Sequence, residues 1–291
     1  SQGISEISNY AFYGCSALSS VKLPTNCQLG KYIFYECDSL NEISIPEGTT
    51  SIYDTYPLDD DKEVDQKNDG ACLAGDAIEK ITFEPGLTKV PSHLCESLTQ
   101  LKTIEWGGVA SLGYHAFNRC ESLTTIELPE KITTLPRLAF GGCKALTSVT
   151  INGKLTYLGE MAFDNCSKMT KFTLKYPEEL KTVYKDVFAN CSGLTELPIG
   201  KDKTPNLTYI GSRAFRECTI DTVTLPGGLT FIGCSAFAEC KNLKSINIPK
   251  SVQHIASNAF MDCEKLDNVV FPEDGKFTVS AADYDGTNSY E

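Results

Sequence analysis

Cysteine is the residue type in this chain that is best suited to chemistry. The 291 residues include thirteen cysteines and only three histidines, His93, His115 and His254. In a secreted chain this cysteine content would suggest disulfides, and clustered cysteine and histidine would suggest zinc. No C-x-x-C pair occurs, so the usual zinc spacing is missing. The sequence also lacks H-E-x-x-H, G-x-S-x-G and phosphate-loop motifs.

Nine of the cysteines recur at one place in an internal repeat. The template reads I-x-x-x-A-F-x-x-C-x-x-L-x-x-I-x-L and returns mostly every 22 or 23 residues. The phenylalanine is present at Phe12, Phe34, Phe117, Phe140, Phe163, Phe188, Phe215, Phe237 and Phe260. The cysteine is present at Cys15, Cys37, Cys120, Cys143, Cys166, Cys191, Cys218, Cys240 and Cys263. Such a period indicates a solenoid, in which stacked copies bury together what no single copy can bury alone.

Eleven copies are present. Their first positions are Ile7, Leu29, Ile52, Val90, Leu112, Leu135, Leu158, Val183, Ile210, Ile232 and Ile255. The third and fourth depart from the template together, and the ninth lacks one residue between Cys218 and its strand. In the third and fourth copies, Cys72 and Cys95 stand where phenylalanine is expected, and Gly75 and Leu98 stand where cysteine is expected. The third copy is also longer than the others, which predicts an insertion near residues 53–70.

Each copy ends in a short alternation of apolar and polar residues, such as Val149-Thr150-Ile151. This pattern is typical of a strand with one buried face, and strands in phase predict a parallel sheet with a spacing of about 4.8 Å. The A-F-x-x-C segment is too short for a full helix, so a short helical or irregular turn is expected there. The predicted fold is an α/β solenoid whose core contains a phenylalanine and a cysteine column. A parallel β-helix is the alternative.

The repeat resembles the BspA-like leucine-rich repeats of surface proteins from bacteria and some protists. The likeness rests on Ala-Phe and Cys at fixed offsets and covers roughly residues 4–272, whereas the third and fourth copies and the insertion depart from it. It implies a leucine-rich-repeat right-handed superhelix with a parallel concave sheet and turns on the convex side. It also implies a secreted, extracellular or cell-surface location and protein binding or adhesion. It implies no catalytic residue and no cofactor.

The regular repeat overrides the usual expectation of about 100–200 residues per domain and predicts a single array over residues 1–272. Residues 273–291 are expected to form a tail, a truncated repeat or a cap, because Phe277-Thr278-Val279 has the alternation of a further strand. No signal peptide and no polar cap precede the first copy. The chain is therefore expected to be cut from a longer protein, or to follow a cap before Ser1.

The template cysteines are expected to face the core as free thiols, because stacked neighbours have parallel Cβ vectors that oppose disulfide geometry. Some disulfides remain the alternative. Cys27 and Cys234 lie outside the template position beside turns and are the expected reactive thiols. The three histidines occupy variable positions and are expected to face solvent. No metal site is predicted.

The chain is acidic, with a formal charge of −12 and a pI near 4.8. An acidic surface repels phosphate backbones and anionic lipids, so nucleic acids and membrane surfaces are poor partners. No apolar run approaches the ~18 residues of a membrane span, so no membrane insertion by this segment is expected. The acidic insertion from Asp59 to Asp65 offers oxygen ligands for calcium. Because it lacks the EF-hand glycine, a solvated loop is the preferred interpretation.

The outward strand positions are expected to form the concave face on which a partner binds. They are rich in serine and threonine and contain no aromatic residue, although interface hot spots favour Tyr, Trp and Arg. The binding candidates are therefore charged strand residues and loop tyrosines: Lys22, Glu42, Lys80, Glu105, Glu127, Lys171, Glu196, Tyr53, Tyr56 and Tyr176. Tyr13 and Tyr35 are expected to align on the convex side, and Trp106 is expected in the core.

Three functions remain open. The favoured one is a cell-surface module that binds a protein, either host extracellular matrix or another surface protein. The second is a structural spacer within a larger surface protein. The third, a carbohydrate-active β-helix, would need a pair of carboxylates in one cleft, and the repeat phase brings no such pair together. Catalysis is therefore not expected.

Overall fold

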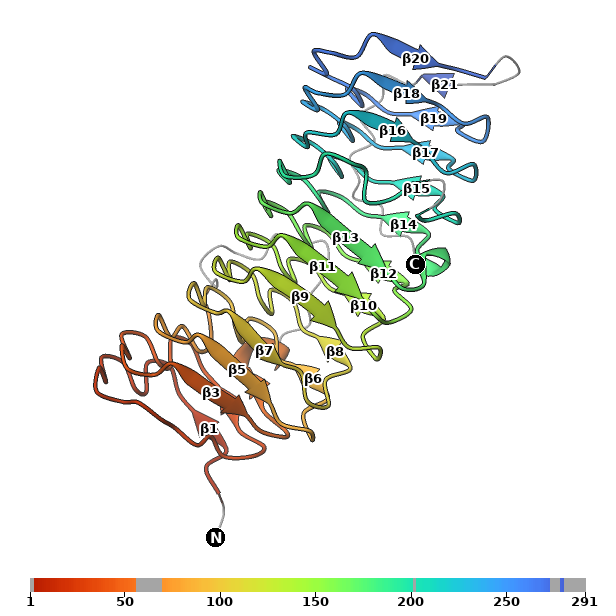
Figure 1. The fold of residues 1–291 in the computed structure, drawn as a ribbon. Helices are drawn as coiled ribbons and strands as arrows, with labels where there is room; N and C mark the ends of the chain where they lie inside the picture. Colours follow the sequence, from red (N-terminus) through yellow and green to blue (C-terminus); the bar gives the residue numbers. More distant parts are fainter. Residues whose placement is uncertain (1–2, 56–69, 201–202, 273–277, 280–291) are drawn as a thin grey trace.

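The chain forms an elongated stack of eleven coils, each built from one copy of the repeat (Figure 1). The computed structural model describes residues 3–55, 70–200, 203–272 and 278–279. Every coil begins with a two-residue strand, and nine coils contain a second, longer strand. The paired strands are parallel and in register from coil to coil. The predicted solenoid is therefore confirmed.

The longer strands lie together on one side, called here the long-strand face. They are β3 (Glu42–Ile45), β5 (Lys80–Phe83), β7 (Thr103–Glu105), β9 (Thr125–Leu128), β11 (Ser148–Ile151), β13 (Lys171–Leu174), β16 (Thr222–Thr224), β18 (Ser245–Asn247) and β20 (Asn268–Val270). They form three separate sheets with the orders β3-β5-β7, β9-β11-β13 and β16-β18-β20. In β9 exposed and buried residues alternate, as the period-2 pattern predicts.

The shorter strands form a second column at the start of each coil. They are β1 (Glu6–Ile7), β2 (Gln28–Leu29), β4 (Thr50–Ser51), β6 (Lys89–Val90), β8 (Ser111–Leu112), β10 (Thr134–Leu135), β12 (Tyr157–Leu158), β14 (Thr182–Val183), β15 (Tyr209–Ile210), β17 (Phe231–Ile232) and β19 (His254–Ile255). A further strand, β21 (Thr278–Val279), pairs with β19. The strand expected at the beginning of the tail is therefore present.

The A-F-x-x-C segments form the turn side of the molecule, and they are not helical. In the regular coils the fourth and eighth template positions adopt left-handed backbone conformations, as at Met161 (φ 55°) and Asn165 (φ 58°). A left-handed residue ends a helix, so two of them within one coil leave no room for a helical turn. The backbone bonds to the next coil instead: Phe140 N donates to Ala162 O at 2.9 Å.

The helical part of the predicted α/β class is therefore wrong, and the irregular-turn alternative describes the turn side. The described residues contain only the short 3-10 helices η1 (Ile52–Thr55) and η3 (Pro177–Glu179). Within these residues no helix has the length and apolar character needed to cross a membrane.

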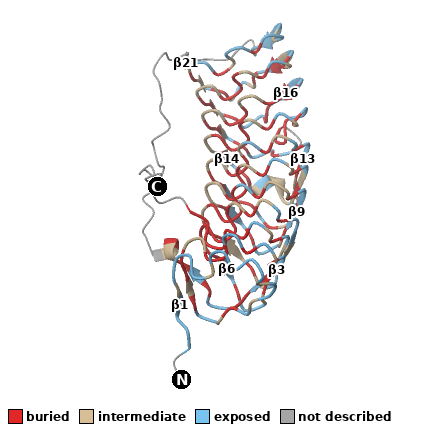
Figure 2. Ribbon diagram, turned by 90° about the vertical axis from the view of Figure 1, so that its left-hand side faces the viewer, coloured by how far each residue is buried: buried red, intermediate tan, exposed pale blue. Residues whose placement is uncertain are grey.

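One continuous core runs through the stack of coils (Figure 2). The phenylalanine rings stack from coil to coil, with centroids 5.7 Å apart for Phe140–Phe163 and 5.8 Å apart for Phe163–Phe188. The template cysteines form the neighbouring column, and the Cys166 thiol donates to Phe140 O at 3.3 Å. Seven other template cysteines make the same bond to the preceding coil.

All thirteen cysteines are free. Eight of the nine template cysteines are buried, as predicted, but the ninth, Cys15, is exposed. Of the two thiols that were predicted to be reactive, Cys27 and Cys234, the first is not accessible. Cys27 is fully buried, because its turn packs between the first and third coils and its carbonyl accepts a bond from Thr50 N at 3.1 Å. Cys234 is half-buried. The exposed thiol is Cys15, which lies in the first coil, where no described coil covers its outer side.

Candidate functional site

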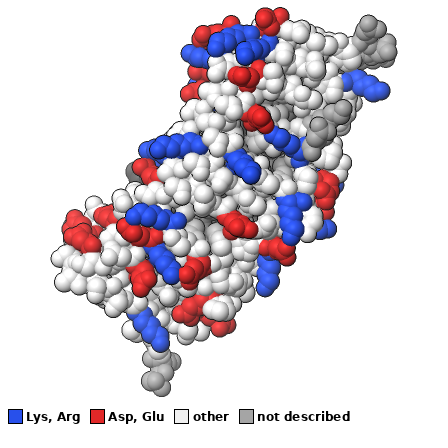
Figure 3. Space-filling view, viewed as in Figure 1, with Lys and Arg blue, Asp and Glu red and all other residues white. Residues whose placement is uncertain are grey.

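The charged residues that were predicted to form a binding face lie along the long-strand face. Glu42, Lys80, Glu105, Glu127 and Lys171 occupy outward positions of β3, β5, β7, β9 and β13. Figure 3 shows that positive and negative side chains are interspersed over this side of the molecule. The Nζ atom of Lys80 lies 2.7 Å from Oε1 of Glu105. The face is therefore a mixed-charge surface and not a patch of one sign.

The remaining strand candidates lie where the long-strand face is irregular. Lys22 and Glu196 are exposed, but coils one and eight have no long strand. Tyr176 is half-buried beside η3, and its ring centre lies 5.6 Å from the ammonium groups of both Lys154 and Lys175. These three residues are thus available at the surface without belonging to a sheet.

Of the two insertion tyrosines, the structure describes only Tyr53. Tyr53, predicted to be a loop anchor for a partner, is buried, with 9% of its surface exposed. Its hydroxyl donates to Gly70 O at 2.6 Å and its ring packs against His93 at a centroid distance of 4.2 Å. Tyr53 therefore closes the base of the insertion and does not face solvent. Tyr56 and the acidic segment lie outside the described residues.

Four tyrosines line the turn side of the first two coils. Tyr10 stacks on Tyr32 with centroids 5.3 Å apart, and Tyr13 stacks on Tyr35 at 5.7 Å. Tyr10 and Tyr13 each expose about half of their surface, at 52% and 51%. The predicted alignment of Tyr13 with Tyr35 is confirmed. Trp106, predicted in the core, packs against the core but is only half-buried.

A side chain links the short strands of coils three and four, whose long strands β5 and β7 are paired. β4 and β6 are not paired. The carboxylate of Asp54 bridges them by accepting from Ser51 N at 3.0 Å, from Ser92 N at 3.2 Å and from Lys89 Nζ at 3.0 Å. Burial acts against its charge, but these bonds hold the pKa of Asp54 below its ordinary value. An aspartate thus replaces a β-ladder at this junction.

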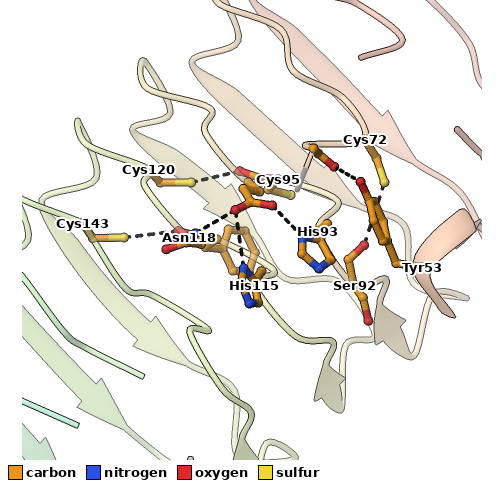
Figure 4. A network of polar contacts seen from close by, with 12 residues as sticks. Tyr53, Cys72, Ser92, His93, Cys95, His115, Asn118, Cys120 and Cys143 are labelled. Carbon is orange, nitrogen blue, oxygen red and sulfur yellow. Dashed lines mark hydrogen bonds and ion pairs between the residues drawn. The ribbon is translucent and has the colours of Figure 1, made fainter. Parts of the chain in front are cut away.

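A buried polar cluster lies next to this junction on the turn side (Figure 4). Nδ1 of His93 lies 2.5 Å from one carboxylate oxygen of Glu96, and Nδ1 of His115 lies 3.5 Å from the other. The side-chain amide of Asn118 donates to Glu96 at 2.7 Å. All four residues are buried, so the prediction that His93 and His115 face solvent is wrong. His254 is half-buried and stacks on Phe231 at 5.1 Å.

The charge of Glu96 is stabilised by its neighbours. Burial alone would raise its pKa, but hydrogen bonds from His115 and His93 lower the pKa of Glu96 to about 2. An ionised carboxylate only accepts hydrogen bonds, so both imidazoles must carry a proton on Nδ1. The cluster is therefore a satisfied ionic network inside the protein.

The donor types of the cluster match those of a zinc site, but their geometry does not. Nitrogen and oxygen atoms of His93, Glu96 and His115 all lie within 4.8 Å of one another. The two imidazole rings are stacked, with centroids 4.4 Å apart and planes 26° apart. A zinc ion lies in the plane of each imidazole that binds it, about 2.0–2.1 Å from the nitrogen. Stacked rings cannot both direct a lone pair at one such ion, so the cluster fits a hydrogen-bonded network better.

A hollow of about 360 Å³ opens beside the cluster on the turn side. It is lined by Glu96, Ser97, His115, Asn118 and Arg119, among others. Within the described part of the chain, Ser97 makes no hydrogen bond to either imidazole. The contact between nucleophile and base that acyl transfer needs is therefore missing.

The family model described as "BspA type Leucine rich repeat region" matches this chain over residues 1–56, 68–195 and 202–282, in six copies. The chain belongs to the BspA-type leucine-rich repeat family. The resemblance deduced from the Ala-Phe and Cys spacing is thereby confirmed.

Two solved structures share the BspA-type chain's fold. A leucine-rich repeat protein from Bacteroides ovatus is 23% identical, covers 95% of this chain and 84% of its own, and gives a TM-score of 0.61. A leucine-rich repeat protein from Eubacterium ventriosum is 20% identical, covers 90% and 81%, and gives a TM-score of 0.56. At these identities the likeness is one of fold. No curated protein matches the chain.

The polar cluster of this BspA-type repeat was missed from the sequence, although a signal existed. His93 and His115 occupy the same template position in consecutive coils, and Glu96 and Asn118 share another. In a solenoid equal positions stack, so the four side chains had to meet. The variable positions were expected to face solvent, and for that reason the coincidence was not used.

Proposed function

We propose that this chain is a cell-surface module that binds another protein through its long-strand face. The observation that carries the proposal is the row of outward charged residues on successive parallel strands, from Glu42 on β3 to Lys171 on β13. Solenoids commonly bind through such extended surfaces. The likeness to BspA-type repeats of surface proteins supports a location outside the cell. The net charge of −12 favours a partner with a basic surface.

The turn side of the first two coils offers a second surface. The stacked pairs Tyr10–Tyr32 and Tyr13–Tyr35 present aromatic area, and tyrosine is enriched at interface hot spots. A structural spacer remains the alternative function, because interspersed charges are also ordinary for a solvated protein surface.

A binding profile of the full chain against extracellular matrix and bacterial surface proteins tests the proposal. We expect saturable binding to at least one basic partner, and we expect this binding to weaken as salt is raised. Glu42→Lys on the long-strand face should weaken it. Glu36→Lys, an equal charge change on the exposed turn side, should not. Saturable binding to none of the proteins would favour the spacer, and equal effects of the two variants would exclude the long-strand face.

A further inference from the structure

The long-strand face is split between coils four and five. β7 and β9 lie in consecutive coils but are not paired, whereas β5 pairs with β7 and β9 pairs with β11 (Figure 1). The bond that leads into a long strand is also missing here. Thr147 N donates to Thr124 O at 2.8 Å, but Thr124, in the described part of coil five, donates no such bond to coil four. The backbone N–H and C=O groups on the facing edges of β7 and β9 therefore do not form hydrogen bonds with each other.

The two coils remain joined on their other sides. On the turn side, Cys95 N donates to Ala116 O at 3.0 Å, and beside the short strands Gly113 N donates to Val90 O at 2.8 Å. The opening is therefore confined to the long-strand face, and the rest of the coil holds its two edges in place.

A hollow of about 600 Å³ lies at this split, and both polar and apolar side chains line it. Ile104 and Trp106 line it from coil four, and Ile126 and Leu128 line it from coil five. Ile104 is half-buried, although Ile81, its partner in register on β5, is fully buried. The indole of Trp106 is half-buried, with its ring stacked on Phe83 at 6.0 Å. A ligand in the hollow would therefore meet apolar surface.

Two carboxylates flank the split on its outer side. The carboxylate of Glu105 on β7 forms an ion pair with Lys80 Nζ at 2.7 Å and accepts a hydrogen bond from the Thr82 hydroxyl at 3.0 Å. Glu127 on β9 also lines the hollow and accepts a hydrogen bond from the Asn152 amide at 3.0 Å. Lys102 also lines the hollow, but its ammonium group pairs with Glu79 at 2.8 Å. Because the hydrogen-bond donor to Glu127 is a neutral amide, a positive charge placed between the two strands would be stabilised.

We propose that the split is a slot for one extended segment of a partner protein that carries an apolar–basic–apolar triplet. The proposal rests on the proposed function and specifies the part of the long-strand face that recognises the partner. An added strand would lie about 4.8 Å from each neighbour and use both free edges. Its alternating side chains would place the apolar residues over Ile104 and Trp106 and the basic residue between Glu105 and Glu127.

The second break in the long-strand face does not offer the same site. It lies at coil eight, beside β13, with a hollow of about 410 Å³ lined by Phe172, Pro177 and Pro198. Lys203 Nζ already donates to Leu197 O at 3.0 Å, so that acceptor is used within the chain. Pro198 has no N–H to donate to an added strand. Of these two breaks in the described long-strand face, the split between β7 and β9 is therefore the one that presents two usable strand edges.

The slot contains its own reporter, because Trp106 is the single tryptophan of the chain. The full chain is titrated with a blocked seven-residue peptide of alternating valine and lysine. We expect a saturable shift of Trp106 emission to shorter wavelength as the indole loses water. A peptide with glutamate in place of lysine should give none. A lysine peptide with N-methylated central amides should bind much more weakly, because it cannot complete the strand hydrogen bonds.

Two variants locate the binding. Glu127→Lys should weaken binding of the lysine peptide by at least about tenfold, whereas Glu36→Lys, the same charge change on the exposed turn side, should leave its affinity unchanged. The slot is excluded if the lysine peptide gives no saturable shift, if N-methylation has no effect, or if both variants weaken binding equally. If a protein partner found by profiling binds Glu127→Lys normally, the slot fails as its binding site while the proposed function stands. If the peptide binds but no protein partner is found, the slot stands as a peptide-binding site while the proposed function fails.

Discussion

The core between coils is filled by different residues in two regions of the molecule: the regular pair of coils six and seven, and the irregular coils three to five. In the regular pair, Phe140 stacks on Phe163 and each template cysteine bonds to the preceding coil. In coils three and four the ring positions hold Cys72 and Cys95. Phe83 and Trp106 fill the space from the long-strand side. Their ring centroids lie 6.2 Å and 5.5 Å from that of Phe117. Aromatic rings from the long-strand side thus pack against the phenylalanine column where it is interrupted.

The connections between coils differ in the same way. β10 and β12 in the regular pair are joined by a ladder, whereas Asp54 joins coils three and four with its carboxylate. Glu96 then ties coil four to coil five. Where the template is kept, identical neighbours stack through backbone and rings. Where it is lost, buried side chains add to the backbone bonds that still join the coils, and the insertion, the turn-side hollow and the split in the long-strand face all lie in this region.

The largest expected effect lies in the regular column. Phe163→Ala should lower the free energy of unfolding by about 3–5 kcal/mol, because it leaves a cavity between two stacked rings. Cys95→Ala, in the interrupted part of the column, should cost clearly less, because Phe83 and Trp106 supply the bulk there. Urea unfolding followed by circular dichroism measures both, with Phe163→Leu as the milder control. Equal losses for the two alanine variants would contradict the comparison.

The irregular region should respond to the loss of its network. Glu96→Ala leaves the buried groups of His93, His115 and Asn118 without their shared partner and should cost about 1–3 kcal/mol at pH 7. Glu121→Ala removes an exposed carboxylate that pairs with Lys144 and should cost no more than about 1 kcal/mol. A Glu96→Ala variant as stable as Glu121→Ala would show that the network contributes nothing.

The same network predicts a pH dependence. The pKa of Glu96 in the folded chain is lowered to about 2, below the ordinary value of about 4.3 in an unfolded chain. A depressed folded pKa gives stability that is fully present above about 4.3 and is lost as the pH falls toward about 2. Urea midpoints between pH 7 and pH 3 should therefore fall less steeply for Glu96→Gln than for the unaltered chain. Parallel slopes would refute this contribution.

The smallest expected effect concerns reactivity and not stability. A thiol reagent applied to the folded chain should label Cys15 first and Cys234 more slowly, because these are the exposed and half-buried thiols. The column cysteines should resist, since burial raises the pKa of Cys143 to about 12 and keeps its thiol protonated. Mass spectrometry of labelled peptides, with urea-unfolded chain as the control, measures this. Rapid native labelling of Cys143 or Cys166 would contradict the buried column.

Much of this architecture was predictable because equal template positions stack in a solenoid. The spacing of Phe140, Phe163 and Phe188 predicted the ring column, and the cysteine spacing predicted free thiols beside it. The turn side was predicted less well. Its left-handed positions hold residues as different as Met161 and Asn165, so no residue type predicted the left-handed backbone conformation. The burial of Tyr53 could not be predicted from the sequence either, because it depends on contacts with Gly70 and His93 from other parts of the chain.

The sequence by itself determined the period, the number of coils, the apolar columns and the acidic surface, because each follows from residue types repeated at fixed spacing. Only the tertiary structure decided where neighbouring coils part. Both β7 and β9 keep the alternation of a strand, so no local pattern indicates that these two strands are unpaired. Equal template positions place His93 on His115 and Glu96 on Asn118, but only the tertiary structure decided that the turn side buries them.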